Sequence, residues 1–84
     1  MRYNGWHNRA TWNAALWLQN DEWCYMSGRA LCEKSNARTL PEAAAAIRDY
    51  CRQIWPTGST PDGFPLASIP KAGWREIARS FRKD

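Results

Sequence analysis

The chain has 84 residues, a formal net charge of +4 and a hydrophobic fraction of 44%, which together predict a single domain over residues 1–84 with one hydrophobic core. No apolar stretch approaches the roughly 20 residues that cross a bilayer, and the first residues lack the apolar segment of a signal peptide. These features exclude a membrane protein and predict a soluble protein in the cytoplasm of its host cell.

The first predicted helix ends near Asn20, after a polar lead-in. Asn8 or Thr11 caps it, because both side chains accept hydrogen bonds from the free N–H groups of a helix start. Apolar residues lie on two sides of this helix, which indicates a central position in a small domain. Trp12 and Trp17 belong to these two stripes, and we expect both rings in the core.

The next segment is predicted to form a second helix that ends near Lys34. Residues 20–22, Asn-Asp-Glu, combine a break with a capping residue and an acid in the first turn of a new helix. Gly28 weakens this helix. One continuous helix over residues 11–34 is the alternative, in which Gly28 lets a neighbouring helix come close. We favour two helices.

The third predicted helix has the clearest start in the chain. Thr39 caps it, Pro41 lies in its first turn, and Glu42 reaches back to complete a capping box. Apolar residues then recur at helical spacing until Pro56 ends the helix.

Residues 56–65 are rich in loop formers, and Pro61-Asp62-Gly63 has the composition of a β-turn. Ser68 and Pro70 then open the last helix. One face of this helix is apolar at i, i+3, i+4 and i+7 and is formed by Trp74, Ile77, Ala78 and Phe81. The sequence therefore predicts an all-α fold, a compact bundle of three to four short helices with a Pro/Gly-rich loop before the last one.

The residues suited to metal or covalent chemistry lack the spacing that such sites need. A metal site would draw on His7, Cys24, Cys32 and Cys51. No Cys-x-x-Cys or His-x₃-His pairing is present among them, nothing local activates any cysteine as a nucleophile, and the chain has no glycine-rich phosphate loop. We expect no enzymatic activity, no cofactor and no metal.

A surplus of basic residues near the C-terminus predicts contact with an acidic partner. Four of these residues form a ridge on the last helix: Arg75, Arg79, Arg82 and Lys83. Their spacing suits successive phosphates or acidic side chains. Arg48 and Arg52 extend the ridge if the third and last helices pack side by side. The tryptophans beside polar turns are expected to contact a partner, and they are Trp6, Trp23 and Trp55.

Residues 4–21 read N-G-W-H-N-R-A-T-W-N-A-A-L-W-L-Q-N-D. This run resembles a family of small phage- and plasmid-encoded proteins that open with N-G-W-x-N-x-x-T-W-x-x-x-L-W-L-x-N-D. Residues 60–63 and 73–78 look like its weaker downstream blocks. The resemblance implies a setting in a mobile genetic element, in which small proteins often block host defence by binding a CRISPR effector or a restriction enzyme.

This setting predicts a non-enzymatic inhibitor of host defence, of the anti-CRISPR type, that binds a host protein or nucleoprotein effector such as a CRISPR or restriction complex. Many such inhibitors imitate DNA through dense negative charge, whereas this chain is net positive. We therefore expect contact with an acidic protein surface or with nucleic acid inside the effector, by a monomer or weak homodimer. The alternative is a small nucleic-acid-binding regulatory protein that uses the same ridge.

Overall fold

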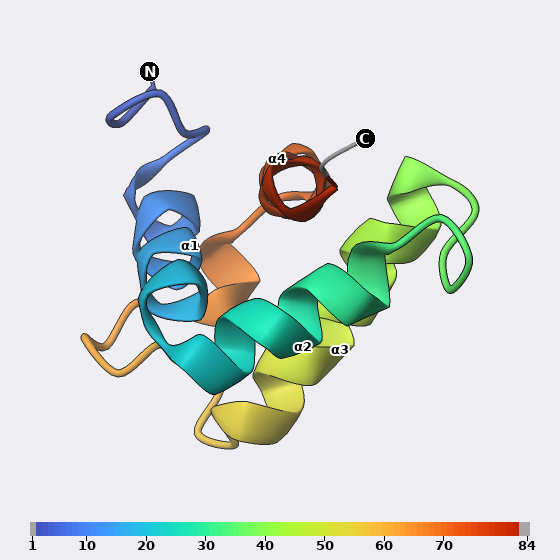
Figure 1. Cartoon of the computed structure of the whole chain (residues 1–84). Coiled ribbons are helices and arrows are strands. Elements are labelled where there is room, and N and C mark those ends of the chain that lie inside the picture. The colour runs from blue at the N-terminus through green and yellow to red at the C-terminus, as the bar shows by residue number, and fades with distance from the viewer. Residues whose placement is uncertain (1, 83–84) are drawn as a thin grey trace.

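Four α-helices make up most of the chain in the computed structural model, which describes residues 2–82 (Figure 1). The helices are α1 (Arg9–Asn20), α2 (Glu22–Cys32), α3 (Leu40–Ile54) and α4 (Lys71–Phe81), and a short 3₁₀ turn at Leu66–Ser68 precedes α4. The only β features of the described residues are two isolated bridges, Tyr3–Trp6 and Ser59–Pro65. The predicted all-α fold is confirmed. No helix within residues 2–82 is long and apolar enough to cross a membrane.

Helices α1 and α2 are separate because Asp21 ends one and begins the other. Its backbone is extended, and its carboxylate accepts a hydrogen bond of 2.9 Å from the backbone N–H of Cys24, which lowers the pKa of Asp21. The preference for two helices is confirmed. Asn8, rather than Thr11, caps α1, since its Oδ1 atom accepts hydrogen bonds from both the N–H and the hydroxyl of Thr11.

The remaining helix starts also follow local sequence signals. The predicted capping box of α3 is present, with Thr39 and Glu42 each accepting a hydrogen bond from the other's backbone N–H at 3.2 and 3.0 Å. The predicted β-turn is present as well, because the N–H of Gly63 donates to the carbonyl of Thr60 at 2.8 Å. Pro70 lies at the start of α4.

The core contains mostly small and aliphatic side chains, and most of the aromatic rings lie at its edge. Trp74 and Phe81 are the buried aromatic residues of the described chain. Trp12 is half-buried and Trp17 is 38% exposed, so the expectation that both belong to the core is wrong. The core-facing alanines are Ala10, Ala14, Ala15, Ala37, Ala43, Ala44 and Ala78. Their small side chains let the helices pack closely, which leaves the bulkier rings at the rim.

The contact between α2 and α4 depends on Gly28. A Cβ atom at this position would lie 2.8 Å from two ring carbons of Phe81, a side chain that is only 2% exposed. We expect Gly28→Ala to lower the free energy of unfolding by about 1–3 kcal/mol through overpacking, although alanine is the better helix former. Urea denaturation measures the change. Ala30→Gly, at an exposed position of the same helix, measures how the difference in helix propensity between alanine and glycine changes the stability, without a change in packing. A Gly28→Ala protein as stable as the wild type would contradict this account.

Candidate anion-binding groove

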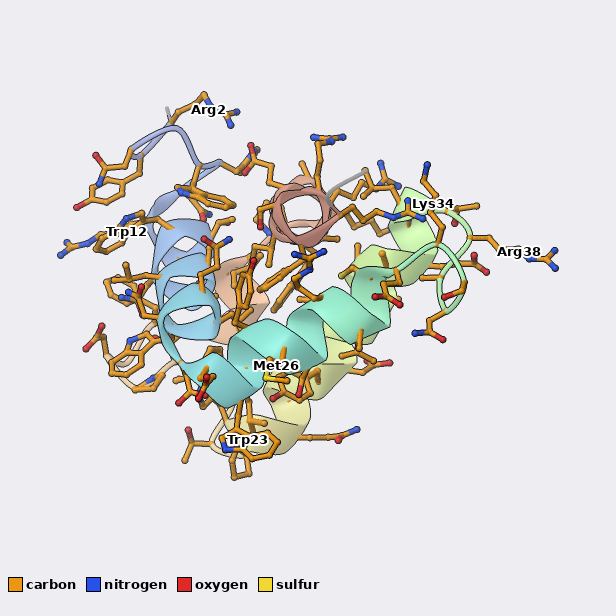
Figure 2. The ribbon with its side chains drawn as sticks, in the orientation of Figure 1. Arg2, Trp12, Trp23, Met26, Lys34 and Arg38 are labelled. Carbon is orange, nitrogen blue, oxygen red and sulfur yellow. The ribbon has the colours of Figure 1, made fainter. Side chains whose placement is uncertain are left out.

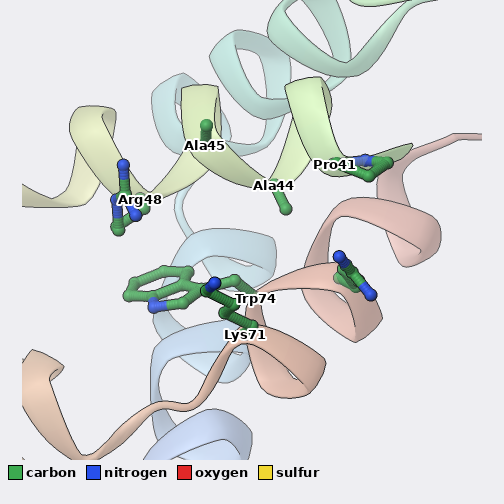
Figure 3. A pocket seen from close by; sticks show the side chains of 7 residues that line it. Pro41, Ala44, Ala45, Arg48, Lys71 and Trp74 are labelled. Atoms are coloured by element: carbon green, nitrogen blue, oxygen red, sulfur yellow. The ribbon is translucent and has the colours of Figure 1, made fainter. Parts of the chain in front are cut away.

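Helices α3 and α4 pack side by side, and two cavities of about 200 and 370 Å³ open along their junction. Figure 3 shows the first of them. The two cavities share Arg48, Lys71 and Trp74 as lining residues, so they adjoin at these side chains, and we treat them together as one depression. Arg75 lines the first cavity and Arg52 the second. We call this depression the α3–α4 groove and define it by these five residues.

Helical spacing places the four cations of the groove along its two walls. Arg48 and Arg52 are four residues apart on α3, as are Lys71 and Arg75 on α4, so each pair lies on one helix face about 6 Å apart along the axis. On α4, the ring of Trp74 is buried, whereas its neighbours Lys71 and Arg75 are exposed. Figure 3 shows Arg48 on α3, and Trp74 and Lys71 on α4, on the two sides of the junction.

Positive charge in the groove is only weakly compensated. Asp49 forms an ion pair with each arginine of α3, its Oδ1 atom lying 3.6 Å from Nε of Arg48 and 3.9 Å from a terminal nitrogen of Arg52. Both separations exceed hydrogen-bonding distance. Lys71 and Arg75 make no ion pair with any residue in 2–82. The groove therefore concentrates cations that repel one another.

One hydrogen-bond donor in the groove has no acceptor. The Nε atom of Arg48 is buried, and within residues 2–82 it makes no hydrogen bond. A buried donor without an acceptor is unfavourable, so the guanidinium group of Arg48 gains free energy if it turns towards a ligand oxygen. The start of α4 adds to this effect, because Pro70 provides no side-chain cap and the first turn contains no acid. The partial positive charge of the helix start is thus uncompensated beside Lys71.

The predicted basic ridge is divided in the structure. Arg79 is exposed, whereas Arg82 turns inward and donates hydrogen bonds to the backbone carbonyls of Cys32 at 3.0 Å and Ala37 at 2.7 Å. The prediction that Arg82 faces outward with the other arginines is wrong. The reason is that Cys32, at the end of α2, and Ala37, in the connection after it, present carbonyl groups that a guanidinium group is well suited to satisfy.

The other basic residues considered for binding lie mostly along the α3–α4 groove. Arg48 and Arg75 line one cavity, as expected if the third and last helices pack side by side, and Arg52 adjoins them. Lys71 was not singled out as a binding residue, although its position four residues before Arg75 is a signal that helical spacing provides. Lys83 lies outside the described residues.

The tryptophans predicted to contact a partner occupy different environments. Trp23 is 77% exposed and Met26, also on α2, is 59% exposed (Figure 2). Trp6 and Trp55 are half-buried and pack against the core. Of the three tryptophans, Trp23 is therefore the one whose side chain is mostly exposed and can contact a partner.

A carboxylate in the loop before α4 anchors that loop to α1. Asp62 accepts hydrogen bonds from the side-chain amide of Asn13 at 2.8 Å and from the indole N–H of Trp17 at 2.9 Å. These two bonds, that of Asn13 first, hold the pKa of Asp62 below its usual value. They also explain why the ring of Trp17 lies at the surface.

We expect this anchor to be lost in acid. A carboxyl group with a lowered pKa contributes stability above its unfolded pKa, near 4, and the contribution disappears as the pH falls through the lower folded pKa. The indole N–H signal of Trp17 in ¹H–¹⁵N NMR spectra should therefore move below about pH 4. The same signal should not titrate in Asp62→Asn. A wild-type signal that stays in place throughout this acid range would contradict the proposed anchor.

The three cysteines are unpaired, with Cys24 half-buried and Cys32 and Cys51 buried. Burial raises the pKa of Cys32 to about 11 and that of Cys51 to about 12, so both thiols are protonated at neutral pH. In the part of the chain that the structure describes, no three His, Cys, Asp or Glu side chains lie close enough together to hold a metal ion.

A sequence family with the description Family of unknown function (DUF7249) matches residues 1–65. The chain belongs to this family. The match includes α1, α2 and α3, so in this DUF7249 protein Arg48 and Arg52 lie inside the matched region, whereas Lys71 and Arg75 lie beyond it. No curated protein and no solved structure matches the chain. The description of the DUF7249 family names no activity.

Proposed function

We propose that this protein is a non-enzymatic binding protein that takes up the phosphate backbone of nucleic acid in the α3–α4 groove. The observation that supports this proposal is the convergence of four cations from two helices on one groove. Among the described residues that line it, none is a carboxylate. Arginine and lysine are the side chains that bind phosphate oxygens through charge-assisted hydrogen bonds.

The arrangement of the charges favours a polymer over a single anion. The cations form two pairs, one on each helix, so the groove offers positive charge repeatedly along its walls. A nucleic-acid strand carries one phosphate per nucleotide and meets such a repeat with several contacts at once. Binding also relieves the mutual repulsion of the four cations.

The chemistry of the lining supports binding rather than catalysis. Apart from its cations, the groove is lined by proline, glycine, aliphatic residues and the ring of Trp74. None of these side chains serves as a nucleophile or as a general base near neutral pH. The proposal therefore assigns the groove no reaction.

Fluorescence anisotropy with a labelled oligonucleotide of about 20 nucleotides tests the proposal. Neutralisation of up to four phosphates predicts that the logarithm of the affinity falls linearly with the logarithm of the salt concentration, with a slope of about −3 to −4 between roughly 50 and 200 mM salt. Absence of binding at the low end of this range would refute the proposed function. Binding that does not weaken with salt would refute the role of the phosphates.

A second candidate is a phage- or plasmid-encoded inhibitor of host defence, of the anti-CRISPR type, that docks on a host nucleoprotein effector. The exposed side chains of Trp23 and Met26 favour it, because binding to free nucleic acid through the groove makes no use of them, whereas exposed tryptophan is enriched at the energetic centres of protein interfaces. In this candidate the groove contacts the nucleic acid of the effector.

A pull-down of the tagged protein from its host tests the second candidate, with Trp23→Ala as the matched variant. Recovery of CRISPR or restriction subunits by the wild type, and their loss with Trp23→Ala, would support it. Absence of such subunits from the wild-type sample would count against it.

A further inference from the structure

A third cavity, of about 310 Å³, lies between α4 and the N-terminal arm, which comprises residues 2–8. Its lining residues are Arg2, Gly5, Trp6, Glu76, Arg79 and Ser80. We call it the arm cavity. It shares no lining residue with the α3–α4 groove, and the proposed function makes no use of it.

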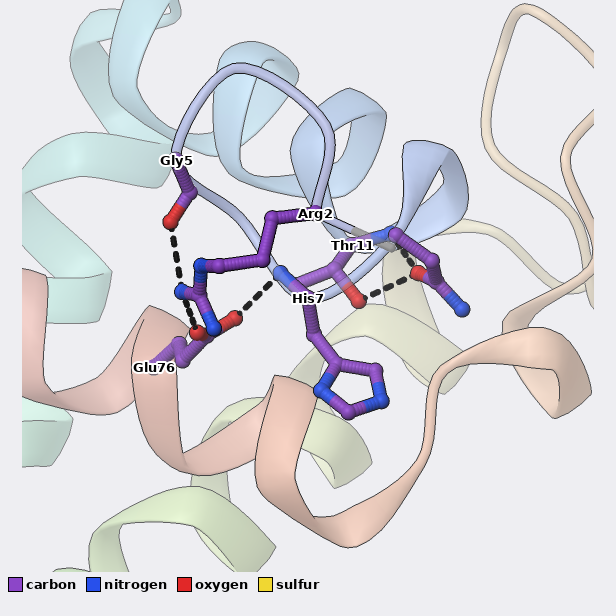
Figure 4. Close-up of polar contacts among 6 residues, drawn as sticks. Arg2, Gly5, His7, Thr11 and Glu76 are labelled. Carbon is purple, nitrogen blue, oxygen red and sulfur yellow. Dashed lines mark hydrogen bonds and ion pairs between the residues drawn. The ribbon is translucent and has the colours of Figure 1, made fainter.

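The arm is held on α4 through Glu76. One carboxylate oxygen pairs with the guanidinium group of Arg2, and the other accepts a hydrogen bond of 2.7 Å from the backbone N–H of His7 (Figure 4). Arg2 also donates to the carbonyl of Gly5 at 2.6 Å. Glu76 is the only carboxylate among the described residues that line the cavity; both of its oxygens are therefore engaged, and its negative charge is compensated by Arg2.

Among the described residues that line the arm cavity, two side chains make no polar contact, and they are a cation and an aromatic ring. Arg79 is exposed and makes no ion pair with any residue of the described chain, and Trp6 is half-buried in the cavity wall. An aromatic ring beside a guanidinium group is the combination that holds a nucleobase and its phosphate in single-strand-binding proteins. The ring in the groove differs, because Trp74 is only 6% exposed and offers little surface for a base.

The two sites are joined along α4. Lys71, Arg75 and Arg79 follow one another at four-residue steps, so they lie on one face of the helix over about 12 Å. The first two line the groove, and the third lines the arm cavity. A nucleic-acid strand whose phosphates contact Lys71 and Arg75 in the groove can therefore continue along α4 to Arg79 and the ring of Trp6.

On this basis we infer that the ligand is single-stranded nucleic acid, which lies along α4 with its phosphates on Lys71, Arg75 and Arg79 and places one base in the arm cavity against Trp6. This inference rests on the proposed function and adds the class of nucleic acid. A duplex keeps its bases stacked and paired, so it can contact the cations but cannot fill the cavity without unpairing.

The first experiment compares a single strand with the duplex of the same sequence, at equal length and salt concentration, by anisotropy. We expect the wild type to bind the single strand at least about tenfold more tightly. Equal or tighter binding of the duplex would overturn the inference and leave the proposed function standing. Failure to bind either form would instead refute the proposed function.

The second experiment uses variants of the arm cavity. Trp6→Ala should weaken single-strand binding by roughly 5- to 150-fold, which is the range for loss of one stacked base, and should change duplex binding by less than about twofold. Trp23→Ala, which removes an exposed tryptophan elsewhere, should leave both affinities unchanged. Single-strand affinity in Trp6→Ala equal to that of the wild type would overturn the inference.

Trp6 also packs against the core, so Trp6→Ala alters the packing of the protein as well as the arm cavity. The variant at Arg79 therefore provides an independent readout. Arg79 is exposed, so Arg79→Ala should keep the helical circular dichroism spectrum of the wild type. It should lower the salt slope for the single strand by about one, as expected for one lost phosphate contact. An unchanged slope would remove Arg79 from the path of the strand and overturn the inference.

Discussion

Arg75→Glu is expected to weaken oligonucleotide binding by about 10- to 100-fold, because it removes a charge-assisted contact and leaves a carboxylate in its place. Arg48→Glu/Arg75→Glu, which reverses a charge on each wall of the groove, should weaken binding by more than about 100-fold. Both effects should shrink as the salt concentration rises, since they act on phosphate contacts. Anisotropy titrations at several salt concentrations measure them.

Arg38→Glu is the matched control for Arg75→Glu. Arg38 is also an exposed arginine, but it lies in the connection between α2 and α3 and projects away from the helices (Figure 2). The control makes the same change in net charge outside the groove, so it should lower the affinity by less than about threefold. Equal losses for Arg38→Glu and Arg75→Glu would show that overall charge, rather than the groove, governs binding.

Arg82→Ala is expected to have the opposite profile, with a large loss of stability and little direct effect on binding. The guanidinium group of Arg82 donates to the carbonyls of Cys32, Ala37 and Arg38, which ties the end of α4 to the end of α2 and the following connection. Loss of these bonds leaves carbonyl groups unsatisfied in a half-buried place. We expect the free energy of unfolding to fall by about 2–3 kcal/mol.

Urea denaturation measures this loss, and two further variants define its cause. Arg82→Lys retains the charge but not the planar fork that reaches several carbonyls, so it should recover only part of the stability. Arg79→Ala, on the exposed side of the same helix, should change the free energy of unfolding by less than about 0.5 kcal/mol. A stability of Arg82→Ala within that same margin of the wild type would contradict the assigned role.

The helices were predictable from the sequence because their boundaries depend on residues within a few positions of one another. Asn8 bonds to Thr11, Asp21 to Cys24, and Thr39 to Glu42, each three residues further along the chain. Such contacts are a property of local sequence, so they hold whatever packs against the helix.

The composition of the core was not predictable in the same way. Helix α1 is apolar on two sides, and the choice between them depends on which neighbouring helices cover it. Alanines permit the closest packing, so they face inward. Trp17 lies at the surface because its indole N–H donates a hydrogen bond to Asp62, in a loop far along the chain. A tryptophan has a polar group as well as a large ring, and the partner of that polar group decides its place.

The candidate site was predictable in part. Arg48, Arg52 and Arg75 were recognisable as surface cations, but their convergence required α3 and α4 to lie side by side. The inward turn of Arg82 carries no local signal, because the carbonyls that it satisfies lie more than 40 residues earlier in the chain. Long-range contacts of this kind become visible only in the folded chain.

A ¹H–¹⁵N NMR titration of the labelled protein with an unlabelled single-stranded oligonucleotide tests the central claim most directly. The largest chemical-shift changes should fall on the backbone amides of residues 44–52 and 71–79, which surround the groove and lead to the arm cavity. The amides near Trp23 and Met26 should change little. Shifts confined to α2, with none along α3 and α4, would contradict the assignment of the groove as the nucleic-acid-binding site.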